Sequence, residues 1–160
     1  MTEDGITRRR LFALLKDPPA PALPKALPGL VTQEAVYIHR APEGLSCARW
    51  SDHMRRAGFI VKTKETNDLN MIKERLGVPS DLAACHTAEL ADYVIEGHVP
   101  ASAVKRLFAE KPKARGLAVA GMPAGAPGVE CLDEDPYEVV IFGTNYREVY
   151  MKFIGTRVIS

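Results

Sequence analysis

The chain has 160 residues, 46% of them hydrophobic and 26% charged, and its formal net charge at pH 7 is +1. This composition is ordinary for a soluble globular domain. The near-zero net charge gives no sign of binding to nucleic acid or to an anionic membrane surface, and no apolar run approaches the roughly 20 residues that a membrane-spanning helix needs. The 3 cysteines are too widely spaced for a disulfide framework, and their odd number leaves at least one free thiol or metal ligand.

Residues 1–34 are expected to form an N-terminal arm. Residues 7–12 read TRRRLF, which resembles a twin-arginine export signature. A secretory signal continues with an apolar core of about 7–15 residues, whereas Lys16-Asp17 interrupts the apolar stretch early. The prolines between positions 18 and 28 then indicate an extended linker. The arm is therefore either a degenerate or replaced export signal, which predicts a periplasmic protein, or a basic helix with a Pro-rich tail of a cytoplasmic one.

The folded domain is expected to span residues 35–160 and to begin with a strand, a helix and a strand. Residues 34–39 read EAVYIH, which is rich in residues that favour strands. Ser46 can cap a helix that ends at Gly58, and residues 59–63 form the next strand. The apolar face of this helix recurs at helical spacing, at Cys47, Trp50, Met54 and Ala57.

A second helix follows, capped by Asn67 or Asp68 and ended by Gly77. Its predicted buried stripe consists of Leu69, Ile72 and Leu76.

A β-hairpin and a third helix come next. Residues 82–90 form the first strand of the hairpin, Ala91-Asp92 its turn and residues 93–95 its second strand. Pro100 suits the first turn of a helix over residues 100–110.

The first strand of this hairpin contains the only cysteine and histidine that are neighbours in the sequence, Cys85 and His86. Successive side chains on a strand point to opposite faces, so only one of the two would face a given site unless the strand is bulged. The ordinary structural explanation is a small buried cysteine beside a surface histidine.

The remainder of the chain is predicted to hold a long loop and a second hairpin. Residues 116–128 read GLAVAGMPAGAPG, which is too rich in glycine and proline for regular structure. Long loops in compact domains tend to be functional or mobile. Residues 137–142 and 148–154 then pair around a turn at residues 143–145.

The resulting order is β-α-β-α-β-β-α with an extra C-terminal β-hairpin, which predicts an α/β fold of the thioredoxin-like type. In that fold the active residues lie at the start of the first helix, where Cys47 falls. A proline before the third strand faces them, and Pro79 holds that place, so we expect a cis peptide bond between Val78 and Pro79.

Several short motifs occur in the order in which a known family carries them. They are W-x-x-H at Trp50–His53, RAGF at Arg56–Phe59, IK at Ile72–Lys73, GVP at Gly77–Pro79, ACHTA at Ala84–Ala88, YVIEGHVPA at Tyr93–Ala101, RL at Arg106–Leu107 and GLAVAGMPAGAPG at Gly116–Gly128. Over about residues 35–142 the chain resembles the family once called domain of unknown function 411, whose copper-handling members are the CopG-like periplasmic proteins. The resemblance implies a thioredoxin-like fold and copper(I) held by clustered cysteine sulfurs, usually in export-dependent copper resistance.

The chain departs from the family in its cysteines. The family carries a Cys-x-Cys-Cys motif before the helix, and its three cysteines align with Gly44, Ser46 and Cys47, so only the last thiol is present. The cysteine of the family's CHT motif matches Cys85.

In the glycine-rich loop, Met122 is retained, while the methionine that usually ends the loop motif is Val129 here. Cys131 has no counterpart in the family pattern.

These residues predict a copper(I) site in which Cys47, Cys85, His86 and Met122 are the candidate ligands. Soft thiolate and thioether groups select copper(I), and two thiolates can hold one ion, alone or with His86 or Met122. The start of a helix should also favour the thiolate form of Cys47. The expected partners are the metal ion and other copper-handling proteins, with no nucleic acid and no stable membrane insertion.

Two alternatives stay open. The first is thiol-redox chemistry, in which Cys47 and Cys85 approach and form a disulfide, although the chain lacks the C-x-x-C pattern. The second is a degenerate member of the family that has lost metal binding and serves as a binding module. No constellation typical of a hydrolase stands out, so we expect a binding protein rather than an enzyme. His53 is expected to make a structural hydrogen bond and His98 to tie down the loop.

Overall fold

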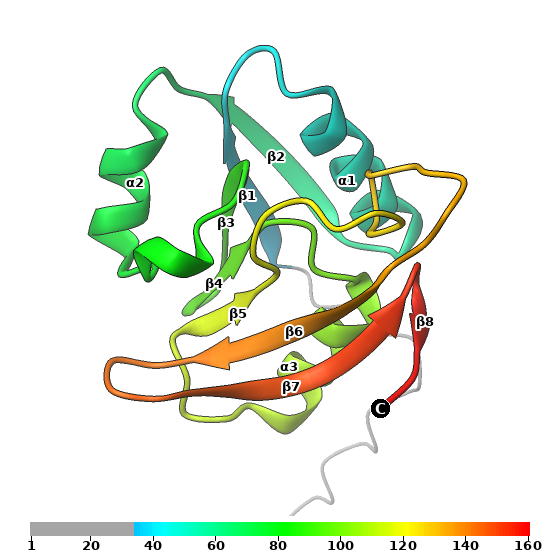
Figure 1. The fold of residues 1–160 in the computed structure, drawn as a ribbon. Helices are drawn as coiled ribbons and strands as arrows, with labels where there is room; N and C mark the ends of the chain where they lie inside the picture. Colours follow the sequence, from blue (N-terminus) through cyan, green and yellow to red (C-terminus); the bar gives the residue numbers. More distant parts are fainter. Residues whose placement is uncertain (1–33) are drawn as a thin grey trace, which may run out of the picture. The chain divides into compact units, whose positions relative to one another are not determined.

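The structure, a computed structural model, describes residues 34–160 as a mixed α/β domain. The strands form one eight-stranded sheet in the order β2-β1-β3-β4-β5-β6-β7-β8 (Figure 1). The strands are β1 (Ala35–Arg40), β2 (Ile60–Glu65), β3 (His86–Leu90), β4 (Tyr93–Glu96), β5 (Gly116–Ala118), β6 (Pro136–Phe142), β7 (Arg147–Ile154) and β8 (Arg157–Val158). The helices are α1 (Leu45–Arg56), α2 (Leu69–Leu76) and α3 (Ala101–Glu110), with a 3-10 turn at Ser80–Leu82.

The first four strands in the sequence lie together at one edge of the sheet, in the order β2-β1-β3-β4. β1 pairs in parallel with β2, which α1 connects, and antiparallel with β3. β3 and β4 form a hairpin around Ala91-Asp92, as predicted, and Ala91 takes a positive φ of 51° in the turn. The predicted hairpin of β6 and β7 is also confirmed.

The helices cover both faces of the sheet. Trp50 and Met54 of α1 and Leu107 of α3 pack in one core cluster, whereas Leu76 of α2 packs in another. Neighbouring residues of β4 show that these clusters lie on opposite faces, because Val94 belongs to the α2 side and Ile95 to the other.

The helix ends follow local sequence signals. The Asp68 side chain accepts a hydrogen bond from the backbone N–H of Met71 at 3.0 Å, which confirms one of the two predicted caps of α2. Gly77 ends the helix with a φ of 73°, in the left-handed region that glycine adopts without strain. The predicted cap of α1 is wrong, because α1 begins at Leu45 and Gly44 precedes it with no side-chain cap.

Three further predictions are wrong. The peptide bonds of the described residues are all trans, so the cis bond before Pro79 is absent. The strand predicted from residue 82 begins only at His86, because residues 80–82 form a 3-10 turn. The segment predicted as loop from residue 116 begins with the short strand β5, since β4 and β6 supply hydrogen-bonding partners on both sides.

The predicted arm, up to residue 33, lies outside the described residues. Within residues 34–160, no helix is both long and apolar enough to cross a bilayer.

Candidate metal centre

Four side chains that can ligate a metal meet between the start of α1 and the adjoining ends of β3 and β4. They are Cys47, Cys85, His86 and His98, and their ligating atoms all lie within 4.8 Å of one another. Cys47 lies in the first turn of α1, Cys85 just before β3, His86 at the first position of β3, and His98 just after β4. We call these four residues the Cys/His cluster.

Strand pairing explains why His98 lies beside Cys85. β3 and β4 pair with Leu90 opposite Tyr93 and Thr87 opposite Glu96. Continued beyond the strand ends, the same register puts residue 85 opposite residue 98. The backbone N–H of Gly97 donates to the carbonyl of His86 at 3.0 Å, which extends the pairing in this direction.

The helix α1 and the loop over residues 119–129 close the cluster from the other sides. The Trp50 indole N–H donates to the Val99 carbonyl at 2.8 Å and joins α1 to the end of β4. The loop passes beside α1 (Figure 1). Gly128 allows this approach, because a Cβ there would lie 2.6 Å from the Ser46 carbonyl oxygen and 3.3 Å from Nδ1 of His98.

The two sulfurs of the cluster are in contact. Sγ of Cys47 lies 3.2 Å from Sγ of Cys85, and all three cysteines of the chain are free. Nε2 of His98 lies 2.9 Å and Nδ1 of His86 3.3 Å from Sγ of Cys85. Cys85 is therefore the central member of the cluster, with three potential ligands around its sulfur.

A hydrogen bond to the loop orients His98. Its Nδ1 donates to the Pro127 carbonyl at 2.7 Å, which leaves the lone pair of Nε2 facing the sulfur of Cys85. A carbonyl that fixes the far nitrogen of an imidazole is the usual outer partner of a metal-ligating histidine. The predicted tie between His98 and the loop is thus confirmed.

His86 is completely buried and only partly satisfied. Its ring lies 4.5 Å from that of Trp50 and 5.0 Å from that of His98, measured between centroids. Nε2 of His86 has no hydrogen-bond partner among the described residues.

The surroundings of the two thiols shift their pKa values in opposite directions. A hydrogen bond from the Cys85 thiol lowers the pKa of Cys47 to about 4, against the opposing effect of burial, and His86 adds to the lowering. The same hydrogen bond and burial raise the pKa of Cys85. Burial and the nearby His86 lower the pKa of His98 to about 4. At neutral pH the cluster thus holds one thiolate, one thiol and a neutral His98.

The structure brings three of the four predicted ligands together. Cys47, Cys85 and His86 join the cluster, and the prediction that Cys85 and His86 point to opposite faces is wrong, because Cys85 precedes β3 instead of lying in it. Met122 lies in the loop after β5 and is 50% exposed, and its role as a ligand stays a prediction.

His98 is the member that the sequence analysis did not select as a ligand. The signal was available, because a two-residue turn at positions 91 and 92 pairs residue 90 with residue 93 and so residue 85 with residue 98. His53 plays the predicted structural part, since its Nε2 accepts the Ala101 N–H at the start of α3 at 3.0 Å.

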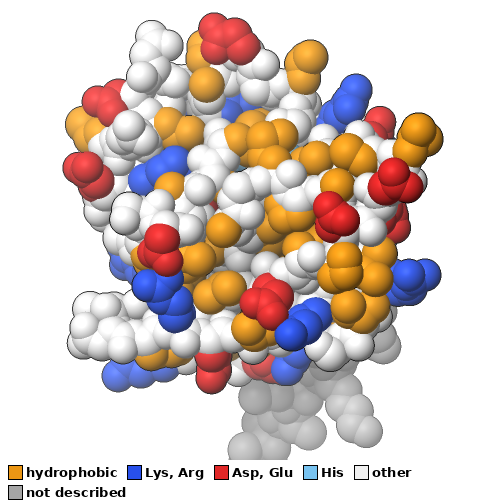
Figure 2. Space-filling view, viewed as in Figure 1, with side chains coloured by type: hydrophobic (Ala, Val, Ile, Leu, Met, Phe, Trp, Pro, Cys, Tyr) orange, Lys and Arg blue, Asp and Glu red, His pale blue; other side chains and the backbone are white. Residues whose placement is uncertain are grey.

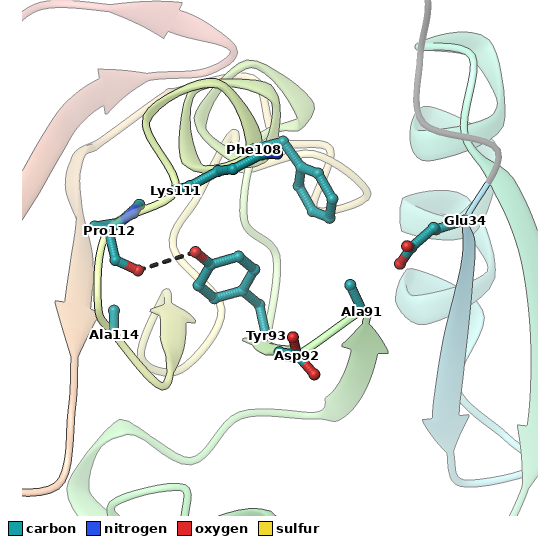
Figure 3. Close-up of a pocket in the computed structure, with 8 residues that line it drawn as sticks. All are labelled: Glu34, Ala91, Asp92, Tyr93, Phe108, Lys111, Pro112 and Ala114. Carbon is teal, nitrogen blue, oxygen red and sulfur yellow. Dashed lines mark hydrogen bonds between the residues drawn. The ribbon is translucent and has the colours of Figure 1, made fainter.

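A surface cavity that shares no residue with the Cys/His cluster offers no competing constellation of this kind. This cavity, of about 720 Å³, lies between the β3–β4 turn and the end of α3, and Tyr93 donates there to the Pro112 carbonyl at 2.9 Å (Figure 3). Its lining contains no cysteine or histidine. On the face shown in Figure 2, basic and acidic side chains are interspersed, which agrees with the net charge near zero.

Comparisons with known proteins agree with the motifs. The family described as "Protein of unknown function, DUF411" matches residues 82–129. A solved structure named "Copper resistance protein copG- Form 2" is 35% identical in sequence and has a TM-score of 0.73. The match covers 76% of this chain and 99% of the chain of that structure. "Copper resistance protein copG- Form 1" is also 35% identical, with a TM-score of 0.72 and coverages of 76% and 98%. The curated proteins give no match. The chain therefore belongs to the family of CopG-like proteins, DUF411.

Proposed function

We propose that the protein binds a single copper(I) ion at Cys47, Cys85 and His98, with His86 as a further ligand. The observation that carries this proposal is the position of Cys85, whose sulfur lies 3.2 Å from the sulfur of Cys47 and 2.9 Å from Nε2 of His98. Soft thiolates select copper(I), and imidazole is a suitable ligand for copper among other metals. The structural relatives are named copper resistance proteins, and we extend that role to this chain.

Binding requires a small opening of the cluster and the loss of one proton. With metal–sulfur bonds of about 2.3 Å, two thiolates on one tetrahedral ion lie about 3.8 Å apart, so the 3.2 Å between the sulfurs must widen by about 0.6 Å. Cys47 is already the thiolate, and Cys85 must release its proton to the solution when the metal binds.

One ion suits the cluster better than several. The family's Cys-x-Cys-Cys motif supplies thiolates that can bridge ions, whereas this chain has Gly44 and Ser46 at two of those places. A Cβ at Gly44 would lie 3.2 Å from Sγ of Cys47, so the missing sulfur would have entered this same cluster.

Zinc is the competing metal, because two cysteines and two histidines are a usual tetrahedral zinc set. The selectivity of the same four residues for copper(I) over zinc therefore belongs to the test.

Thiol-redox chemistry is the second candidate, and the contact between the sulfurs favours it. A disulfide needs a sulfur–sulfur bond of about 2.05 Å, so Cys47 and Cys85 must approach by roughly 1.2 Å from their separation of 3.2 Å. The lowered pKa of Cys47 also makes it the better nucleophile at neutral pH. If neither metal nor redox chemistry is found, a degenerate binding module is the third candidate.

Finer features of the prediction remain part of the proposal. The order β2-β1-β3-β4, with α1 and α3 on one face and α2 on the other, supports a thioredoxin-like core. We also propose that residues 1–34 form an arm outside the domain of residues 35–160 and direct the protein to the periplasm, where copper-handling proteins would be its partners. Met122 is proposed as an accessory ligand.

The test is anaerobic competition for copper(I) and, separately, for zinc against chromophoric chelators. We expect the native protein to bind one copper(I) ion more tightly than about micromolar, and more tightly than zinc. Cys85→Ala should abolish binding, while Cys131→Ser, which removes an exposed cysteine outside the cluster, should leave it unchanged. Absence of copper(I) binding by the native protein, or equal loss in both variants, would refute the proposal.

A further inference from the structure

Lys73 and Glu96 form a buried ion pair next to the backbone that carries Cys85. Lys73 of α2 is only 7% exposed and Glu96 of β4 is completely buried. The ammonium of Lys73 contacts Oε1 of Glu96 and donates to the Thr87 hydroxyl at 2.8 Å. That hydroxyl donates in turn to Oε2 of Glu96 at 2.6 Å. Lys73 thus turns inward at a position of α2 where the apolar stripe alone would predict a hydrophobic residue.

The other role of Glu96 is to hold the backbone that carries Cys85. Oε1 of Glu96 accepts the backbone N–H of Ala84 at 2.7 Å. Residues 83–85 lie between the 3-10 turn and β3, so sheet pairing does not hold this N–H. The end of β4 also packs closely on Ala84, because a Cβ at Gly97 would lie 2.7 Å from Cβ of Ala84.

Burial of an ion pair carries a large desolvation cost in free energy. Removing two charges from water costs much of what their attraction returns, and well-packed apolar residues of the same volume often stabilise a protein as well or better. Stability therefore gives little reason for the pair, whereas its contact with Ala84 gives a specific one.

We propose that Glu96 is a positioning residue of the metal centre, whose carboxylate fixes Ala84 and thereby aims the sulfur of Cys85 at Cys47 and His98. Lys73 and Thr87 hold the carboxylate in place. This inference rests on the proposed metal site for its main readout, but the sulfur geometry that it concerns exists without metal. Outer partners of metal ligands typically change metal affinity 10–100-fold when they are removed.

A matched pair of double variants separates positioning from stability. Both replace Lys73 by Met, so that no unpaired ammonium is buried. Lys73→Met with Glu96→Gln keeps an oxygen that can accept the Ala84 N–H, whereas Lys73→Met with Glu96→Met keeps the volume and removes that acceptor. Thermal unfolding establishes that both are folded. Glu96→Asp, with the native lysine, retracts the carboxylate while keeping its charge and serves if the methionine variant does not fold.

Copper(I) affinity and the thiolate-to-copper absorption band are measured first. We expect the Gln variant to stay within about threefold of the native affinity, and the Met variant and Glu96→Asp to lose about 10–100-fold with a changed band. A purely structural role would alter the unfolding temperature and leave the affinity and band of the folded protein unchanged.

The second readout needs no metal. All variants for this readout also carry Cys131→Ser. Each is equilibrated with a glutathione buffer, in which oxidised glutathione is reduced as Cys47 and Cys85 form a disulfide. The equilibrium constant gives the effective concentration of one thiol relative to the other. We expect it to fall at least tenfold in the Met variant and Glu96→Asp but not in the Gln variant. Equal effective concentrations in all folded variants would overturn the inference about Glu96. Failure of the native protein to bind copper would refute only the proposed function, because this second readout needs no metal.

Discussion

The buried state of His98 predicts a pH-dependent loss of stability in the metal-free, reduced protein. Burial lowers the pKa of His98 in the folded protein from an ordinary 6.5 to about 4. The folded state therefore binds fewer protons than the unfolded state between these values. Its stabilising contribution is fully present above pH 6.5 and is lost as the pH falls towards 4.

The magnitude follows from the shift in pKa. The difference of about 2.5 pKa units corresponds to about 3 kcal/mol of folding free energy in total. Between pH 7 and pH 5, about 2 kcal/mol of this is lost, because the unfolded histidine is then mostly protonated while the folded one is still mostly neutral. The structure gives the reason: a second proton would sit on Nε2, which faces the Cys85 sulfur, since Nδ1 already donates to Pro127.

The assay is denaturant-induced unfolding of the native protein and of His98→Asn at pH 7 and at pH 5, with reductant and without metal. Asparagine retains a donor near the position of Nδ1 but does not titrate. Cys47 also titrates in this direction, and because both proteins keep it, its contribution largely cancels. We expect the stability difference between native protein and variant to shrink by about 2 kcal/mol at the lower pH. An equal loss of stability in both proteins would show that His98 is not the group responsible.

Three further substitutions test the packing around the cluster. Gly44→Cys places a Cβ 3.2 Å from the Cys47 sulfur, at a φ of −74° that any residue tolerates. We expect at least tenfold tighter copper(I) binding in the chelator competition. An unchanged affinity would contradict the idea that residue 44 shares the site. Gly128→Ala puts a Cβ 2.6 Å from a carbonyl oxygen of α1 at a φ of +89°, so we expect thermal unfolding to show a loss of about 1–3 kcal/mol; an unchanged melting temperature would rule out this close approach. Trp50→Phe leaves the Val99 carbonyl without its donor and should cost about 1–3 kcal/mol in denaturant unfolding, which a stability equal to that of the native protein would disprove.

Two wrong predictions, for residues 82–85 and 116–118, share one cause, which is that nonlocal strand partners decided the outcome. Residues 82–85 have the composition of a strand, but only from His86 onward does β1 offer a pairing partner. Residues 116–118 look like a loop, yet β4 and β6 lie on either side and recruit them into the sheet. The inward turn of Lys73 likewise has a nonlocal cause, which is the buried carboxylate of Glu96.

Features that depend on neighbours along the chain can be predicted from the sequence alone. The caps Asp68 and Gly77 bound α2, the two-residue turn at positions 91 and 92 sets the hairpin register, and the ordered motifs identify the family. Each depends on a local backbone preference or on a short spacing that a linear reading can measure.

The Cys/His cluster, in contrast, is assembled by contacts that form only in the folded domain. The crossover through α1 brings Cys47 to Cys85, 38 positions later, and packing of residues 119–129 supplies the Pro127 carbonyl that turns His98 towards the sulfur. These contacts join segments far apart in sequence, and they form only when both faces of the sheet are covered and the buried polar groups find partners. The hairpin register places residue 98 opposite residue 85, but spacing along the chain does not encode the contacts that bring Cys47 to Cys85 and orient the His98 ring.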